Sequence, residues 1–380
     1  MKNLAIIPLI FLTAGLVFSA SDTRPRLREF GLKTGVMQPG RLNAITDVKG
    51  VAVGQVTLIK GENIRTGVTA VLPHSGNIYQ AKVPGAVYVA NGYGKLTGYT
   101  QIEELGNIET PIILTNTLSV PTAADAVIDY ILSLKGNETV GSVNAVVGET
   151  NDGYLNDIRG RHVKKEHVLA AIEKAESGVV KEGCVGAGTG TTCYGYKGGI
   201  GTASRKLPEE LGGYTVGVLV QTNHGGVLQI NGLAVGVKLG KYSFKRYLEG
   251  DTDGSCMMVV ATDAPLRSRN LKRLAKRALL GIARTGGYFS NGSGDYAIAF
   301  STAEELRIPH SSEAGTLKIE VLRNSKVSPL FLAAAEAAEE AILNSLFKAE
   351  TVKGREGHIQ EAMPLDKLKE IMGAGRERVK

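Results

Sequence analysis

Residues 251–266, with the sequence DTDGSCMMVVATDAPL, join an acidic, glycine-containing run to an uncharged stretch rich in β-branched residues. Such a stretch predicts a buried strand, and here the strand begins at a small hydroxyl residue, Ser255. If the chain cuts itself before Ser255, the new terminus supplies an α-amine. The ordinary pKa of that amine, about 7.7–8.0, suits it to take the proton of the serine hydroxyl. Gly254 permits backbone angles that other residues disfavour. The alternative is a surface loop that leads into a strand, and these residues alone favour neither interpretation.

Length and composition set wider limits. With 380 residues, the chain can form one large α/β unit or two domains, and either buries an ample core. Its formal net charge of +7 is spread over the chain, and no basic block with interleaved aromatic residues indicates a nucleic-acid partner. Of the three cysteines, Cys184 and Cys193 are candidates for a disulfide in an oxidising compartment. Cys256 is expected to pack as a small apolar residue.

Residues 1–21 have the pattern of a secretory signal peptide. One cation, Lys2, precedes an uncharged run over residues 4–18, and small residues follow at 19–21. The run is short for a membrane-spanning helix, although an uncleaved anchor stays open as the alternative. We therefore expect a periplasmic or secreted protein with no stable membrane insertion after the signal is removed.

The periodicity of apolar residues predicts a mixture of strands and helices. Strands are predicted for residues 51–59, 68–72, 86–90, 143–147, 214–221, 257–262, 296–300 and 317–322, and helices for residues 123–134, 162–175, 271–282 and 329–346. The two kinds of element do not alternate strictly. This order argues against a doubly wound parallel sheet and favours an α/β fold in which layered sheets carry outer helices.

Several segments, in the same order along the chain, resemble the DmpA and β-peptidyl aminopeptidase family. They are residues 64–73 (IRTGVTAVLP), 102–106 (IEELG), 114–120 (LTNTLSV), 149–157 (ETNDGYLND), 222–225 (TNHG), 254–266 (GSCMMVVATDAPL) and 292–296 (GSGDY). The resemblance covers the chain from about residue 26 to the C-terminus. It implies a self-processing, N-terminal-nucleophile-like serine hydrolase with a four-layer αββα fold, which acts as an aminopeptidase without a metal or organic cofactor.

The resemblance also implies roles for the residues at the junction. The serine that matches Ser255 serves first in self-cleavage and then as the catalytic nucleophile. Residues 293–295 match a Ser-x-Glu element whose serine and carboxylate contact the nucleophile and its amine. Here Asp295, one methylene shorter, stands in place of glutamate. If they lie on a strand, Ser293 and Asp295 face the same side. The surrounding composition also fits a turn or a cap, and the residues alone favour that alternative.

Three further residues are candidates for the site. Asn223 follows a predicted strand and matches an asparagine whose amide N–H meets the oxyanion. Tyr154 matches a tyrosine that donates to the intermediate or to the leaving group, and its alternative is an ordinary interface tyrosine. Glu149 is the candidate for binding the protonated amine of the substrate. Its alternative is a solvated loop carboxylate, because Asp152 and Asp157 lie close by and can take the same role.

Cleavage between Gly254 and Ser255 predicts an α chain of residues 22–254 and a β chain of residues 255–380. The two are expected to stay associated, because the strand after Ser255 belongs to the core. The resemblance implies a tetramer of such heterodimers, with a restricted site that takes short peptides, amides or esters.

Two other motifs are set aside. Residues 186–191 (GAGTGT) lack the third glycine of a dinucleotide-binding loop, and we expect them to form a backbone wall of the active-site region. Residues 162–167 (HVKKEH) have one residue too many for a zinc-binding helix, so the two histidines fall on different faces.

Two rival functions remain at this point. One is a related self-cleaving amidohydrolase or acyltransferase that passes the acyl group to an amine instead of water. Ornithine acetyltransferase shares the fold, but its nucleophile is threonine. The other is a non-catalytic secreted binding protein that keeps the fold without the chemistry.

Overall fold

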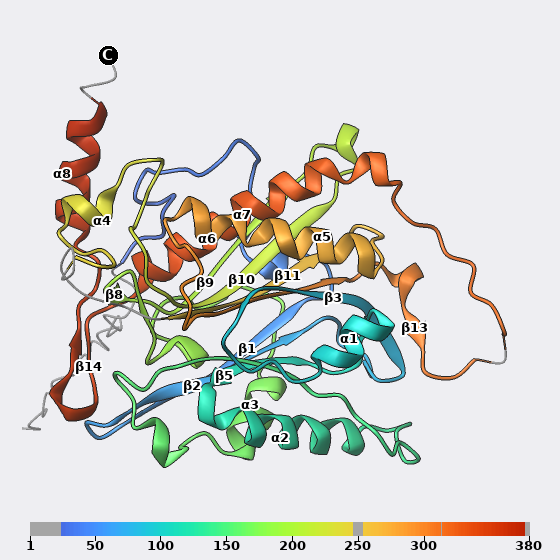
Figure 1. The fold of residues 1–380 in the computed structure, drawn as a ribbon. Helices are drawn as coiled ribbons and strands as arrows, with labels where there is room; N and C mark the ends of the chain where they lie inside the picture. Colours follow the sequence, from blue (N-terminus) through green and yellow to red (C-terminus); the bar gives the residue numbers. More distant parts are fainter. Residues whose placement is uncertain (1–23, 246–253, 313, 377–380) are drawn as a thin grey trace, which may run out of the picture.

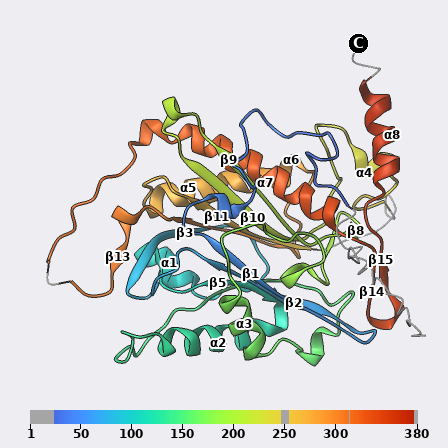
Figure 2. The same ribbon diagram turned by 180° about the vertical axis from the view of Figure 1, so that it is seen from behind.

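The structure, a computed structural model, describes residues 24–245, 254–312 and 314–376. The predicted signal peptide and residues 251–253 of the junction lie outside the described residues. Two β-sheets pack face to face, and helices cover the outer face of each sheet (Figure 1, Figure 2). The predicted four-layer αββα arrangement is therefore confirmed.

The larger sheet has seven strands and contains the segment that begins at Ser255. Its order is β13 (Ile308–Pro309), β3 (Ala81–Gly92), β12 (Gly294–Ser301), β11 (Ser255–Thr262), β10 (Thr215–Asn223) and β9 (Ile200–Lys206), with β4 (Asn107–Ile108) paired to β3. Only β11 and β12 run parallel, and the other neighbours in this sheet are antiparallel. The strand after the junction thus lies in the interior of the sheet.

The smaller sheet has the order β1 (Ala52–Lys60), β2 (Ile64–Leu72), β5 (Ile112–Asn116) and β6 (Val146–Thr150). Its first two pairings are antiparallel and β5 pairs with β6 in parallel. Helices α2 (Val120–Ser133) and α3 (Lys165–Glu173) pack on its outer face.

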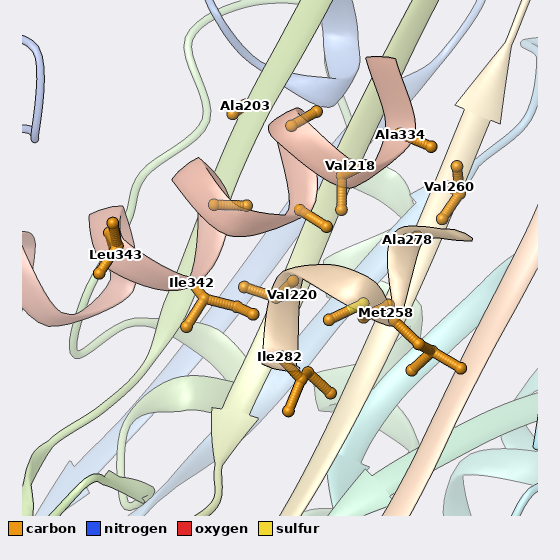
Figure 3. Close-up of a cluster of buried hydrophobic side chains, with 14 of the residues drawn as sticks. Ala203, Val218, Val220, Met258, Val260, Ala278, Ile282, Ala334, Ile342 and Leu343 are labelled. Carbon is orange, nitrogen blue, oxygen red and sulfur yellow. The ribbon is translucent and has the colours of Figure 1, made fainter. Parts of the chain in front are cut away.

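Helices α5 (Ser268–Ala278), α6 (Leu280–Arg284) and α7 (Ser328–Lys348) form the layer over the larger sheet. Because strand side chains alternate between faces, β11 contributes to two cores. Met258 and Val260 point toward the helices and belong to the core cluster that also contains Ile342 of α7 (Figure 3). Met257 and Val259 belong to the core between the sheets. A strand buried on both faces explains why this segment is uncharged throughout.

The remaining elements lie around the sheet edges. They are α1 (Tyr99–Leu105), α4 (Val235–Lys238), α8 (Leu365–Arg376), β7 (Thr192–Cys193), β8 (Tyr196–Lys197), β14 (Val352–Lys353) and β15 (Ile359–Gln360). The hairpin β7–β8 follows the glycine-rich residues 186–191, next to the end of β10.

Several predicted elements require correction. The strand predicted for residues 317–322 is wrong: the segment has no strand structure, and Leu317, Ile319 and Val321 are exposed, while Leu322 is only partly buried. The pattern is that of a strand, but no neighbouring strand among the described residues pairs with it. The helix predicted for residues 271–282 is two helices that meet at Leu279. The strand predicted for residues 143–147 begins three residues later, at Val146.

The proposed disulfide is not formed, because all three cysteines are free thiols. The sulfur of Cys193 lies 3.8 Å from Nε2 of His224, and that of Cys184 accepts a hydrogen bond from the backbone N–H of Glu350 at 3.3 Å. Cys256 is completely buried in the core under the helices, as predicted for a small apolar residue.

Candidate active site

Ser255 lies where three neighbouring strands of the larger sheet begin or end. It is the first residue of β11 and is paired with Asn223, the last residue of β10. Its hydroxyl oxygen accepts a hydrogen bond from the backbone N–H of Gly294, the first residue of β12, at 3.1 Å. The residue keeps only 7% exposure, and it lines a cavity. The nucleophile proposed from the sequence is thus held in place by the sheet itself.

Gly254 is required by space and not by its backbone angles. A Cβ atom at this position would lie 2.2 Å from the carbonyl oxygen of Asn223 and 2.4 Å from Cα of His224. Both neighbours are backbone atoms that cannot move aside, and the φ of Gly254 lies outside the left-handed region. The sequence analysis explained Gly254 by its backbone freedom, whereas the structure explains it by the lack of space for a side chain. Its absent side chain lets the Gly254–Ser255 bond lie against the end of β10.

A cavity of about 320 Å³ opens beside Ser255. Its lining consists of Tyr93, Lys95, Thr117, Glu149, Asn151, Tyr154, Thr192, Asn223, Gly254, Ser255 and Gly292. These residues come from both sheets, since Ser255 and Asn223 belong to the larger sheet and Glu149 to β6 of the smaller one. The structure therefore brings together four of the side chains that the sequence proposed: Ser255, Asn223, Tyr154 and Glu149.

The orientation of the Asn223 side chain is set by a backbone group. The N–H of Thr192 donates to Oδ1 of Asn223 at 2.9 Å. Because a backbone N–H can only donate, this contact assigns the oxygen to the Thr192 side, and the Nδ2 group points away from it. A fixed amide donor beside a serine hydroxyl is the arrangement that an oxyanion hole needs.

Glu149 is a buried carboxylate with two defined donors. Its residue is 4% exposed, Oε1 accepts from the backbone N–H of Lys95 at 3.0 Å, and Oε2 accepts from the hydroxyl of Thr117. Burial raises the pKa of Glu149, while these two hydrogen bonds and the charge of Lys95 act in the opposite direction. The carboxylate is oriented into a polar cavity, where it can pair with a substrate ammonium.

The two other carboxylates considered for this role do not line the cavity. Asp152 is buried and accepts a hydrogen bond from Nδ2 of Asn156 at 2.9 Å, and burial raises its pKa to about 6. Asp157 contacts His162 at 3.0 Å, and this hydrogen bond lowers its pKa. The structure therefore favours Glu149 over both alternatives.

Asp295 does not belong to the lining of the cavity. It is paired in register with Cys256, its residue is 1% exposed, and within the described part of the chain neither carboxylate oxygen has a hydrogen-bond partner. Burial raises the pKa of Asp295 to about 7. The nearby hydroxyl of Ser293 and N–H of Cys256 oppose this rise, although neither makes a hydrogen bond of good geometry.

Ser293 precedes β12 and closes a turn in which its N–H donates to the carbonyl oxygen of Ser290 at 2.9 Å. The strand begins only at Gly294, so Ser293 and Asp295 do not both lie on it, and the turn considered as the alternative is what the structure has at Ser293. The two residues are neighbours through the turn instead.

Tyr154 is about half exposed (48%) at the rim of the cavity. Its ring stacks on that of His358 with centroids 4.5 Å apart and an interplanar angle of 7°. Nδ1 of His358 also lies 2.8 Å from the carbonyl oxygen of Tyr154. This packing fixes the ring while the residue remains accessible, which suits a hydroxyl that acts on bound substrate.

Sequence reasoning missed Thr117, Lys95 and Thr192, because two of them act through backbone groups and all three are distant in sequence from the groups they orient. The glycine-rich residues 186–191 were the available signal for Thr192. Residues 186–191 themselves do not line the cavity, so the wall expected from them is not found there. They pack near the end of β10 instead, where the carbonyl oxygen of Ala187 accepts from Nε2 of Gln221 at 3.0 Å.

No group of three or more His, Cys, Asp or Glu side chains within the described ranges gathers in a way that could hold a metal ion. None of the helices there has the length and apolar character that crossing a membrane requires.

Comparison with known proteins agrees with this geometry. Residues 43–360 match Peptidase family S58. A β-peptidyl aminopeptidase, BapA, from Sphingosinicella microcystinivorans is 43% identical over 378 residues, which cover 94% of each chain. The crystal structure of the PH0078 protein from Pyrococcus horikoshii OT3 is 52% identical, with a TM-score of 0.85 over 92% of this chain and 99% of that one.

The L-aminopeptidase D-Ala-esterase/amidase from Ochrobactrum anthropi is 37% identical, with a TM-score of 0.84 over 92% of this chain and 99% of that one. Its structure is described as a variant of the Ntn hydrolase fold, from a prototype of the serine aminopeptidases. The present fold and site define the same class, an aminopeptidase with the Ntn hydrolase fold. The chain belongs to peptidase family S58.

Proposed function

We propose that this aminopeptidase cleaves its own chain between Gly254 and Ser255 and then hydrolyses short peptides, amides or esters through an acyl-enzyme on Ser255. The observation that carries the proposal is the cavity itself. A serine at a strand start, the amide of Asn223 and the carboxylate of Glu149 all line one space of about 320 Å³. The names of the relatives, which include a peptidyl aminopeptidase and an esterase/amidase, support this range of substrates.

The first step is an acyl shift within the chain. The hydroxyl oxygen of Ser255 attacks the carbonyl carbon of Gly254, the peptide C–N bond breaks, and an ester links Gly254 to Ser255. The nitrogen of Ser255 takes up a proton and becomes a free α-amine. Water then hydrolyses the ester, which leaves a carboxylate on Gly254 and restores the hydroxyl. The close packing of Gly254 against the backbone of Asn223 supports this step, because it holds the bond at the end of β10, where Asn223 lies.

The new amine gives Asp295 the partner that it lacks in the uncut chain. Both oxygens of Asp295 are buried without hydrogen bonds, beside the first residues of β11. A cationic amine on Ser255 would stabilise the ionised carboxylate, and the carboxylate would in turn hold the amine in place. In its neutral form the amine takes the proton of the serine hydroxyl as general base, and the carboxylate of Asp295 stabilises the ammonium that results, in the manner of an N-terminal nucleophile.

The same groups perform the reaction on substrate. Glu149 holds the protonated N-terminus, and the oxygen of Ser255 attacks the first carbonyl carbon. Nδ2 of Asn223, aided by the hydroxyl of Tyr154, stabilises the charge on the carbonyl oxygen. One such donor contributes about 2.7–4 kcal/mol to transition-state stabilisation. The protonated amine of Ser255 gives its proton to the leaving amine, and water then releases the acid from the ester.

The fragments, residues 22–254 and 255–380, are proposed to stay together. β11 is paired with β10 of the first fragment, and α7 of the second fragment packs on β9 and β10. The backbone N–H of Leu27 donates to Oδ1 of Asn344 at 3.0 Å, so the N-terminal segment also contacts α7. By the family resemblance, we propose a tetramer of these heterodimers and a periplasmic or secreted location after removal of residues 1–21.

The test compares wild-type protein with Ser255→Ala on a denaturing gel. The wild type should give two fragments of about 25 and 13 kDa, scaled from 40.2 kDa for 380 residues. Ser255→Ala should give one intact chain with no hydrolysis of aminoacyl p-nitroanilides, a loss of at least about 10⁴-fold. Ser133→Ala, a distant surface change, is the control and should behave as wild type. An alanine variant that still splits into two bands would sink the proposal.

Offering water and amines to the acylated enzyme separates hydrolysis from acyl transfer. Release of free acid at the same rate with and without added amine supports hydrolysis. Preferential formation of a new amide would assign the chain to the acyltransferases instead.

A further inference from the structure

The lining of the cavity contains one carboxyl side chain, Glu149, and one amino side chain, Lys95. Lys95 lies in the segment after β3, and its backbone N–H donates to Oε1 of Glu149. The residues that follow run along β6: Leu96 forms a bridge with Gly148, and the N–H of Thr97 donates to the carbonyl oxygen of Val147 at 3.0 Å. These contacts hold the backbone of Lys95 next to Glu149.

The ammonium group of Lys95 is not neutralised by an ion pair. Its residue is exposed at the cavity, and within the described ranges no carboxylate lies within 4.0 Å of its Nζ atom. Its charge nevertheless acts on Glu149, whose pKa it lowers against the effect of burial. A cation in this place has a cost for the function proposed above, because it repels the ammonium that Glu149 must bind.

The repulsion between Lys95 and the substrate ammonium is offset when the substrate also carries a carboxylate. A molecule whose only charge is its ammonium meets a lining with no net charge. A molecule that carries a carboxylate close to its ammonium meets a complementary pair, since Glu149 binds the cation and Lys95 binds the anion. Because the backbone of Lys95 is hydrogen-bonded to Glu149, which holds the amine, we place the carboxylate on the same residue as the amine and not on the leaving group.

We propose that Lys95 is a specificity-determining residue that binds a carboxylate carried by the N-terminal residue of the substrate. Two sources share this chemistry. One is the side-chain carboxylate of an α-linked aspartyl residue, and the other is the α-carboxylate of a β-linked aspartyl residue, which sits on the same carbon as the amine. The proposal rests on the aminopeptidase function proposed above and deepens it by naming a class of substrate.

The experiment measures kcat/KM for the p-nitroanilides of alanine, α-linked aspartate and β-linked aspartate. It uses wild-type protein, Lys95→Gln, Lys95→Glu and the control Lys33→Gln, whose exposed side chain lies away from the cavity. In Lys95→Gln, the ratio of kcat/KM for the preferred aspartyl substrate to that for alanine should fall about tenfold, which corresponds to about 1.4 kcal/mol. Lys95→Glu should lower the ratio further, and Lys33→Gln should leave it unchanged. The aspartyl substrate whose ratio falls more identifies the source of the carboxylate.

Whether the substitution changes KM or kcat tests the proposed ion pair. Because an ion pair binds ground state and transition state alike, the change should appear in KM and weaken at high salt. The proposal is overturned if Lys95→Gln lowers hydrolysis of all three substrates equally, or leaves the ratio at its wild-type value, while wild-type protein hydrolyses the alanine anilide. Failure of processed wild-type protein to hydrolyse any of the three would instead contradict the proposed substrate range and the site assignment. Two fragments on a gel confirm that each variant is folded and processed.

Discussion

Glu340 and Asp295 are both buried carboxylates, but their surroundings are opposite. Glu340, on α7, forms ion pairs with Arg205 and Arg28 at 2.8 Å each and accepts a hydrogen bond from Asn43. Burial acts to raise its pKa, but the charge of Arg205, with Arg28 and Asn43, outweighs burial and leaves the pKa below its ordinary value. Asp295 has no hydrogen-bond partner among the described residues, so burial prevails and the pKa rises to about 7.

The difference separates a structural charge from a functional one. A buried charge whose partners are complete is stabilised where it is and has no capacity left for a ligand. A buried carboxylate without partners destabilises the fold unless a cation arrives later. In our account that cation is the α-amine of Ser255, which exists only after the chain is cut.

Among the substitutions that test this difference, Asp295→Asn should have the largest effect, a loss of kcat. The amide fills the same space but cannot hold a cationic amine, so kcat of the cleaved protein should fall about 10²–10⁴-fold. In the uncut Ser255→Ala chain, by contrast, the same change should keep or raise thermal stability, because it removes a buried carboxylate that has no hydrogen-bond partner among the described residues. Measurement of kcat per cleaved molecule checks this, and an unchanged kcat would remove Asp295 from the site.

Glu340→Gln, in contrast to Asp295→Asn, should lower stability and leave activity unchanged. It leaves the buried guanidinium of Arg205 with fewer partners, which costs about 3–5 kcal/mol in free energy of unfolding. The activity of each folded molecule should stay the same. Glu339→Gln on the same helix is the matched control, since its pair with Arg284 is partly exposed and contributes about 1 kcal/mol or less. Equal denaturation midpoints for the two variants would contradict a structural role for Glu340.

Asn223→Asp tests the oxyanion site with little change in shape. The hydrogen bond from Thr192 to Oδ1 is kept, but the N–H donor is lost. We expect kcat to fall about 10²–10³-fold with little change in KM. Steady-state kinetics on aminoacyl anilides measures both constants. A rise in KM with kcat unchanged would make Asn223 a residue for substrate binding alone.

The smallest effect concerns pH. In the uncut Ser255→Ala chain, the pKa of Asp295 is raised from its ordinary 3.8 to about 7, so between these values the folded state keeps a proton that the unfolded state has lost. Stability contributed by this group therefore falls as pH rises from about 4 to 7. Adding Asp295→Asn should stabilise the uncut chain by an amount on the order of a few kcal/mol above pH 7 and by nothing near pH 4. Urea titrations at both pH values measure this, and equal effects at the two would contradict the pKa.

The sequence predicted the elements that carry their own pattern. Residues 257–262 are uncharged and β-branched because both faces of β11 are buried, and such a segment has few alternatives. Residues 317–322 have the same apolar pattern without forming a strand, because a strand also needs a neighbouring strand to receive its hydrogen bonds. β9 went unrecognised because its buried residues include Ser204 and Arg205, whose partners come from distant parts of the chain.

The candidate site shows the same limit. Glu149, Asp152 and Asp157 are equivalent in sequence, and only the fold directs the first of them into the cavity. The reason for Gly254, a backbone contact with Asn223, depends on the pairing of β10 with β11. The contribution of Lys95 comes from the pairing of its loop with β6, for which local sequence gives no signal.

N-terminal sequencing of purified, active protein tests the central claim most directly. The account predicts two sequences in equal amounts, one of them beginning Ser255-Cys256-Met257, with activity in proportion to that fragment. Fully active protein in which the bond between residues 254 and 255 is intact would contradict it.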